Sequence, residues 1–360
     1  MTQAVALAQQ ASTGVSQGFK NRIINGAMVI DQRNAGASVT PANGQYSLDR
    51  WKCWQAAASK YTIGQYSTSP TGFTKSIGVS SNSSYSVGAD EYFAVAQLIE
   101  GFNVADLGWG TANAKTVTLS FQVRSSLTGT FGGAINNANL TRSYPFSYTI
   151  ASADTWTTVS VTIPGDTTGT WNTDNSGGIY VWFSLGSGAN NVGPANTWAG
   201  AWYTAPTGSV SVVGTNGANW YITGVQLEVG STATSFDYRP YGTELQLCQR
   251  YFQVIGGGPP DSTAARNEVI ASGMQFTSTE IYYPLRFIQE MRTAPTLTLA
   301  GNLRYYRVGT SATVTTALFE GTTIRTTRIY IASSSGTAGD ASWLQMGGFE
   351  NDRLSASAEL

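Results

Sequence analysis

The sequence contains no histidine and few charged residues, and both absences narrow what the protein can do. Among its 360 residues histidine is missing, and charged side chains make up 11%, which is less than half of the usual ~25%. Without histidine, the Ser-His-Asp and Cys-His nucleophile systems and all imidazole-based metal sites are excluded. We therefore assign no metal-binding residue and expect no cofactor.

Basic charge is not in excess either. Lys and Arg number 20 against 21 Asp and Glu, and the balance holds on both sides of Pro240. Phosphate contacts need a basic surplus, so nucleic acid is not the predicted partner. No run of 18 apolar residues occurs, which predicts no membrane insertion. The opening MTQAVALAQQ lacks the basic start and apolar core of a secretory signal.

Cysteine is scarce as well. Cys53 and Cys248 both lie among apolar or aromatic neighbours in the sequence. We interpret them as two buried free thiols, because an unpaired cysteine usually behaves as a small buried apolar residue. A disulfide framework is not indicated.

Glycine and aromatic residues are abundant instead. The chain has 40 Gly, 10 Trp, 18 Tyr and 14 Phe, with 41% hydrophobic residues, so it has enough apolar surface to fold. Short alternating runs such as TVTLSFQVR at 116–124 and TWTTVSVTI at 155–163 are typical of half-buried antiparallel strands. The pattern predicts an all-β protein with an antiparallel jelly-roll/β-sandwich domain, a short connecting helix and a smaller C-terminal β-sandwich domain.

The predicted domain order follows the turn-rich and linker-like stretches. We assign 1–19 to an N-terminal helical attachment arm, 20–240 to the jelly roll, 241–260 to a short helix with a Gly/Pro linker, and 261–360 to the C-terminal β domain. Thr243 and Gln246 have the spacing of a capping box, and apolar residues follow them at helical spacing through Phe252.

Two finer predictions concern single stretches. From Tyr221 to Val229 every second residue is expected to share one face of a strand. Asp49 and Arg50 are expected to form a partly buried ion pair beside the ring of Trp51.

Several rings lie in Gly/Asn/Thr-rich loops, where a core position is harder to justify. The candidate ligand-binding residues are Trp171, Asn172, Asp174, Trp198, Trp202 and Tyr203. Sugars stack their C–H faces on aromatic rings and exchange hydrogen bonds with amides and carboxylates, so this combination indicates a glycan site. The alternative is that the rings anchor loops or contact another subunit. Oxygen-only calcium binding around Asp166 stays open, although no EF-hand spacing occurs.

Three stretches carry a resemblance to a known family. NRIINGAMVIDQR with YSLDRW covers 21–51, QLEVGSTATSFDYRPYGTELQLCQRYF covers 226–252, and MRTAPT at 291–296 is followed by the ending SASAEL. These stretches resemble bacteriophage tail fibres and tail-associated receptor-binding proteins with a jelly-roll, carbohydrate-binding-like domain.

The resemblance implies a virion structural protein of the tail, assembled in the host cytoplasm, that attaches to a host cell-surface polysaccharide and is not an enzyme. It implies a homotrimer whose N-terminus joins a tail adaptor or another virion protein. The helix has an apolar side that needs a partner, so we expect Leu245, Cys248 and Phe252 at the oligomer interface.

Two alternative functions remain. The first is a purely structural virion protein, such as a head fibre, a decoration protein or a tail adaptor. The second is a polysaccharide depolymerase, which needs two nearby carboxylates. Its candidate acids are Asp90, Glu91, Glu100 and Asp106.

Overall fold

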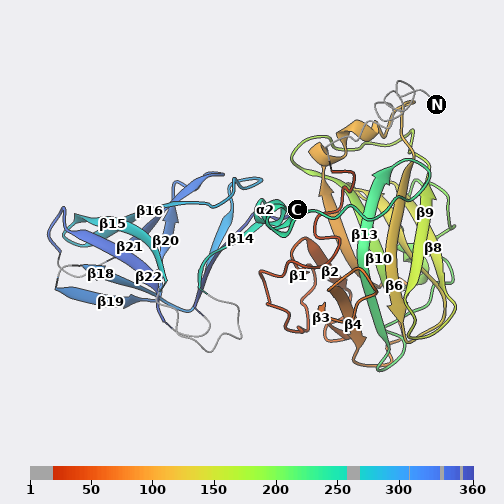
Figure 1. Cartoon of the computed structure of the whole chain (residues 1–360), viewed down its shortest axis with the longest axis horizontal. Coiled ribbons are helices and arrows are strands. Elements are labelled where there is room, and N and C mark those ends of the chain that lie inside the picture. The colour runs from red at the N-terminus through yellow and green to blue at the C-terminus, as the bar shows by residue number, and fades with distance from the viewer. Residues whose placement is uncertain (1–18, 258–267, 308, 333–335, 349–351) are drawn as a thin grey trace, which may run out of the picture.

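Two β-sandwiches joined by one short helix make up the protein (Figure 1). The computed structural model describes residues 19–257, 268–307, 309–332, 336–348 and 352–360. The predicted N-terminal arm, apart from Phe19, lies outside the described residues, as do the last three residues of the predicted linker. The prediction of an all-β protein with two sandwich domains and one short connecting helix is confirmed.

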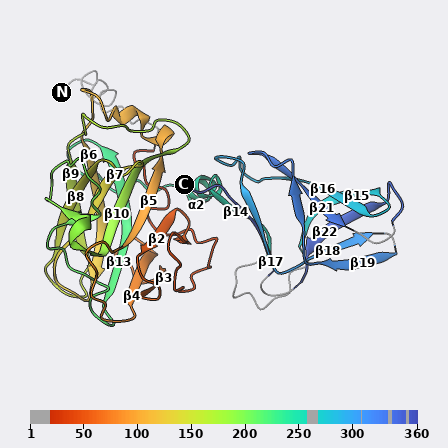
Figure 2. The same ribbon diagram turned by 180° about the vertical axis from the view of Figure 1, so that it is seen from behind.

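The first sandwich packs a six-stranded sheet against a five-stranded sheet. In spatial order the six-stranded sheet holds β1 (Tyr46–Leu48), β2 (Trp51–Gln55), β5 (Tyr92–Glu100), β10 (Gly177–Ser187), β7 (Gly129–Asn137) and β8 (Ser143–Ile150). Figure 2 shows β2, β5, β10 and β7 side by side. The five-stranded sheet holds β3 (Tyr61–Tyr66), β4 (Ser76–Ser81), β13 (Asn219–Val229), β6 (Val117–Ser125) and β9 (Thr157–Ile163).

The chain crosses repeatedly between these two sheets, which gives the jelly-roll arrangement. Alternation along each strand decides which side chains enter the core. In β6, for example, Leu119, Phe121 and Val123 are buried between the sheets. Fully buried Trp51 and Trp220 fill the centre of the core.

Strand β13 does not keep one alternation along its length. Its pairing with β6 shifts register between Thr223 and Gln226, where Gly224 has a φ of +62°. Trp220 and Ile222 face the core before this bulge, and Val225 and Leu227 face it afterwards. The predicted single face was therefore wrong, because the extra residue of a bulge moves the following side chains to the other side.

The second sandwich packs a three-stranded sheet on a seven-stranded one. The small sheet holds β14 (Phe252–Gly257), β23 (Arg353–Ser357) and β17 (Thr296–Ala300). The large sheet holds β19 (Thr310–Val314), β18 (Leu303–Arg307), β22 (Ala341–Met346), β15 (Val269–Thr277), β16 (Glu280–Arg286), β21 (Thr326–Ala332) and β20 (Leu318–Glu320). Strands β14 and β23 were not predicted, and β14 includes Gly256 and Gly257 of the expected linker.

Helix α2 (Tyr241–Gln249) corrects two predictions. Its N-cap is Pro240, and no side chain caps it, so the capping box was wrong. The helix ends before Phe252, which begins β14. Cys248 is fully buried with Ile24 and Tyr251, and Phe252 is 4% exposed. The chain itself covers both residues, so they cannot form the oligomer interface predicted for them, and only Leu245 of that set is partly exposed.

The three stretches that carry the family resemblance meet at α2. Asn21 exchanges hydrogen bonds with Val225 and Leu227 on β13, and Glu244 accepts the backbone N–H of Asn25. From the far end of the chain, the backbone N–H of Arg292 donates to the carbonyl of Arg250 at 2.8 Å. The C-terminus lies beside α2, between the two sandwiches (Figures 1 and 2). These segments form a joint that holds the two domains together.

A buried ion pair lies at the centre of this joint. The guanidinium of Arg50, 1% exposed, pairs with the carboxylate of Glu359, which also bonds Arg33 at 2.6 Å. The ring of Tyr251 stacks 3.7 Å from the Arg50 guanidinium carbon. The predicted Asp49–Arg50 pair was wrong, because Arg50 has a φ of +70° and its partner comes from the other domain.

Cys53 and Cys248 are both free and buried, as predicted. Burial raises the pKa of the Cys53 thiol to about 11 and also raises that of Cys248. Among the described residues, no helix has the length and apolar character needed to cross a membrane.

The Arg50–Glu359 pair predicts a large stability effect. Glu359→Gln should lower the free energy of unfolding by about 3 kcal/mol, because it leaves the buried guanidinium of Arg50 and the partly buried one of Arg33 without their counter-charge. Urea titration followed by circular dichroism measures it. Glu290→Gln is the matched control, since the Glu290–Arg325 pair is exposed and should contribute less than about 1 kcal/mol. Equal effects of the two substitutions would contradict the prediction.

The buried carboxyl group of Asp49 predicts that the stability of the fold depends on pH. Burial raises the pKa of its carboxyl group to about 6, although Arg33 and hydrogen bonds from Gln32 act in the opposite direction. Because the folded pKa lies above the ordinary value, the stability this group contributes is fully present below about pH 4 and is lost as the pH rises through 6.

Over that pH range the wild type should lose about 3 kcal/mol of unfolding free energy relative to Asp49→Asn, which cannot titrate. Urea titrations of both proteins between pH 4 and pH 7 measure the difference. Parallel pH profiles would show that Asp49 titrates normally.

Candidate functional site

Trp171 and Trp198, two of the predicted ligand-binding rings, pack against each other and against Trp109. The three ring centroids lie 4.7 to 5.6 Å apart, and every pair meets edge to face. Each indole N–H donates to a backbone carbonyl: Trp109 to Lys115, Trp171 to Thr168, and Trp198 to Pro164. All three indole N–H groups of this tryptophan cluster are therefore hydrogen-bonded within the chain. These bonds tie the surrounding loops to the sandwich.

The polar residues predicted beside these rings also have partners within the chain. Asn172 donates to the carbonyl of Gly177 at 2.9 Å, and Asp174 accepts from Ser176. Asp166 takes two hydrogen bonds from Arg142, at 2.7 and 2.8 Å. Burial alone would raise the pKa of Asp166, but the bonds from Arg142 and Thr168 hold it below its usual value. Both Asp166 oxygens are engaged, which disfavours the calcium alternative.

Trp202 belongs to a different group of rings on the outer face of the six-stranded sheet. We call it the aromatic platform, and it consists of Trp54, Tyr92, Tyr180, Trp182 and Trp202. Trp202 lies 4.9 Å from Tyr92 and 6.5 Å from Trp182, centroid to centroid. Trp182 lies 5.5 Å from Trp54 and 5.1 Å from Tyr180. The predicted site residues thus divide between two places.

Strand register builds the platform. Trp182 on β10 pairs with Ala96 on β5 and with Ala134 on β7, and Trp54 on β2 pairs with Ala94 on β5. Directly paired residues share a face, so each large ring has a small alanine beside it. The neighbouring Phe183 points the opposite way into the core. The sheet is consequently apolar on both faces along β5 and β10.

The platform differs from the tryptophan cluster in its hydrogen bonding. The indole nitrogens of Trp54, Trp182 and Trp202 are buried and have no hydrogen-bond partner among the described residues. Leaving a buried donor unpaired costs about 1–3 kcal/mol, and three such donors gather within this single group of rings.

One edge of the platform meets the joint. The ammonium of Lys52 lies 4.7 Å from the Trp54 ring centroid and donates to the carbonyl of Leu360 at 3.3 Å. The hydroxyl of Tyr46 donates to the same oxygen at 2.6 Å. The side chain of Leu360 packs against the platform, so the face that carries the rings is bounded by residues of the joint.

The sequence prediction missed Trp54, Tyr92, Tyr180 and Trp182. Tyr203 was predicted, and its ring lies against Gly193 while its carbonyl accepts from Asn136 at 3.0 Å. A usable signal was present in YFAVAQLIE at 92–100 and in IYVWF at 179–183. A strand whose odd-numbered and even-numbered residues are both apolar has both of its faces covered. In these two strands, the aromatic residues that point away from the core form the platform.

No protein-family model matches this chain, and no curated protein matches it. Among solved structures, the enzymatically active domain of tailspike protein 4 of bacteriophage CBA120 has 12% identity and a TM-score of 0.31, covering 58% of this chain and 21% of that one. A sugar-binding protein of Bacteroides thetaiotaomicron, described as putative, has 13% identity and a TM-score of 0.34, covering 59% and 100%.

A family 11 carbohydrate-binding module of Clostridium thermocellum has 16% identity and a TM-score of 0.28, covering 54% of this chain and 100% of that one. This chain therefore aligns to about a fifth of the tailspike and to the whole of each of the two sugar-binding proteins. All three TM-scores lie below 0.5, so no ligand or activity of this chain follows from these similarities.

The tryptophan cluster predicts a structural effect. Trp198→Ala should lower the free energy of unfolding by about 2–4 kcal/mol, because it removes a half-buried ring that packs on two others. Trp198→Phe keeps a ring and should lose only about 1 kcal/mol with the hydrogen bond to Pro164. Chemical denaturation followed by circular dichroism compares them. Unchanged stability with lost glycan binding would instead favour the site first predicted from the sequence.

Proposed function

We propose that this protein is a bacteriophage tail fibre that binds a glycan on the host cell surface through the aromatic platform. The observation that carries the proposal is the group of aromatic rings on the outer face of the six-stranded sheet, of which Trp54, Tyr92 and Trp202 are partly exposed. Sugar rings stack their C–H faces on aromatic rings. A glycan therefore matches the exposed rings of the platform.

Exposure assigns different roles to the rings. Trp54, Tyr92 and Trp202 are partly exposed, so they would contact the glycan directly. Trp182 is 1% exposed and would support them from below. Lys52 is the charged side chain beside Trp54, and the platform residues themselves carry no charge. This composition suits a neutral sugar.

The tail-fibre assignment is supported by the three resembling stretches, which meet at the joint rather than lying scattered over the surface. They would serve as a shared device that orients a binding domain relative to a second domain. We further propose a homotrimer attached to the virion tail through the N-terminus. Since Cys248 and Phe252 are covered by their own chain, three-fold contacts would use other surfaces.

Binding is favoured over hydrolysis by the state of the candidate acids. Asp90 accepts from Asn190, and Asp106 pairs with Arg22. Glu100 is held by Arg250 at 2.6 Å. Hydrogen bonds from the Gly88 N–H and the Tyr85 hydroxyl lower the pKa of Glu91, whereas a general acid needs a raised pKa. Each of these carboxylates therefore has a structural role.

A glycan array probed with the full-length chain tests the proposal. Wild type should bind a defined subset of neutral bacterial glycans. Trp202→Ala should weaken that binding at least ~ten-fold, because a partly exposed stacking ring is lost. Trp202→Phe should retain intermediate affinity. Isothermal titration with the best array glycan quantifies all three proteins.

Trp171→Ala is the matched control, since that ring belongs to the tryptophan cluster and should leave affinity unchanged. Equal loss for both alanine variants would contradict the platform assignment. No specific binding by wild type to any surface glycan would favour the purely structural virion protein instead.

A further inference from the structure

The outer face of the seven-stranded sheet in the second domain carries a continuous row of apolar and aromatic side chains. Met274 on β15 pairs with Tyr282 on β16. Tyr282 pairs in turn with Tyr330 on β21, and Tyr330 pairs with Leu318 on β20. Directly paired residues share one face of a sheet, and the alternate residues of these strands, such as Ile281, fill the core. The row therefore crosses four strands on the outside of the domain.

Large side chains in and around this row are open to solvent. The ring of Phe276 lies 4.8 Å from that of Tyr282, centroid to centroid. The exposed fraction is 55% for Met274, 59% for Phe276, 52% for Leu318 and 46% for Trp343. Together these four side chains expose roughly 400 Å² of apolar surface, and a contiguous patch of that size on a soluble protein commonly marks an interaction site.

The first domain shows what this chain places on a sheet face that meets solvent. The residues of β6 and β9 that point away from the core include Ser120, Gln122, Thr158, Ser160 and Thr162. Hydroxyl and amide groups thus cover that face. The apolar face of the second domain departs from this pattern, which indicates that another surface covers it.

The chemistry of the face favours a polypeptide cover over a saccharide. Met274 and Leu318, at the two ends of the row, have no ring on which a sugar could stack and no strong hydrogen-bonding group for its hydroxyls. An open hollow of about 450 Å³ lies beside Met274, and Phe276, Tyr282 and Pro284 contribute to its lining. Side chains of an opposing protein surface fill hollows of this kind when two sheets pack face to face.

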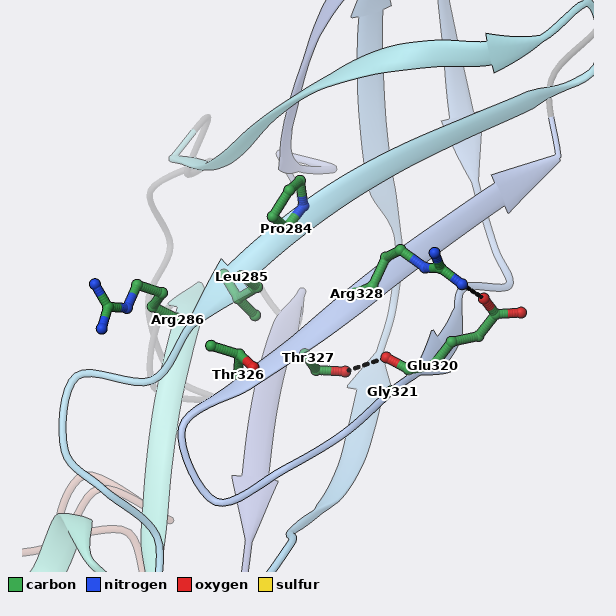
Figure 3. A pocket seen from close by; sticks show the side chains of 8 residues that line it. All are labelled: Pro284, Leu285, Arg286, Glu320, Gly321, Thr326, Thr327 and Arg328. Atoms are coloured by element: carbon green, nitrogen blue, oxygen red, sulfur yellow. Dashed lines mark hydrogen bonds and ion pairs between the residues drawn. The ribbon is translucent and has the colours of Figure 1, made fainter.

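The charged residues of the same face indicate which protein supplies the cover. Glu280 and Arg286 point outward from opposite ends of β16. Neither forms an ion pair among the described residues, whereas Arg328 beside them is paired with Glu320. Figure 3 shows Arg286 extending away from that pair. One face thus carries an unmatched acid at one end and an unmatched base at the other, so a second copy of it supplies the complementary charges.

We propose that this face is the contact surface between copies of the chain. The apolar row would be buried at the centre of the contact, and Glu280 of one copy would meet Arg286 of its neighbour at the rim. An interface of standard size buries about 800 Å² per partner, a little over half of it apolar, and the exposed apolar area of the face is close to that share. The assignment of the face stands on these observations, whereas the number of three copies rests on the proposed function.

Light scattering of the full-length protein tests the apolar centre. Wild type should have three times the mass of one chain. Met274→Glu should weaken association at least ~ten-fold, because it buries a charge without a partner in the contact. Its own fold should persist, since Met274 is more than half exposed, and circular dichroism checks this.

Exchange of the rim charges tests which residues meet. Glu280→Arg and Arg286→Glu should each weaken association at least ~ten-fold, because each sets like charges against one another in every contact. The double variant E280R/R286E should associate about as tightly as wild type, because it restores opposite charges. Asp90→Arg is the matched control, since it makes the same charge change at an exposed position of the first domain and should leave the mass unchanged.

The outcomes separate this proposal from the others. Wild type at the mass of a single chain, or an unchanged mass for Met274→Glu, would overturn the proposed contact, and a double variant that stays dissociated would overturn its charge pairing. Wild type at twice the mass, dissociated by Met274→Glu, would support the face and contradict only the number of copies. Trp202→Ala should keep the wild-type mass, so failure of the platform and failure of this face can be told apart.

Discussion

The arrangement of the two domains depends on one buried ion pair, between Arg50 of the first domain and Glu359 near the end of the chain. Two charges taken out of water cost free energy unless each has enough partners. Here Glu359 also bonds Arg33, and Arg50 stacks on Tyr251 and donates to the carbonyl of Leu98. The pair is therefore tolerated only with both domains in place, which makes the joint a specific contact.

The joint also sets the boundary of the aromatic platform. Leu360 follows Glu359 directly, and its carbonyl and side chain contact Tyr46, Lys52 and the platform rings. A change in the relative position of the domains would therefore move residues at the edge of the proposed glycan site. The proposed glycan site and the attachment of the second domain therefore involve the same structural element.

The sequence by itself determined the all-β class, the two sandwich domains, the helix near 241 and the two buried thiols, because period and composition are local properties. It could not determine that Arg50 pairs with Glu359 instead of Asp49, or that a bulge at Gly224 changes the face of β13. It also grouped Trp171, Trp198 and Trp202 in one site, whereas tertiary structure placed Trp202 on a different face. Such outcomes depend on register and on contacts between residues hundreds of positions apart, which no local pattern records.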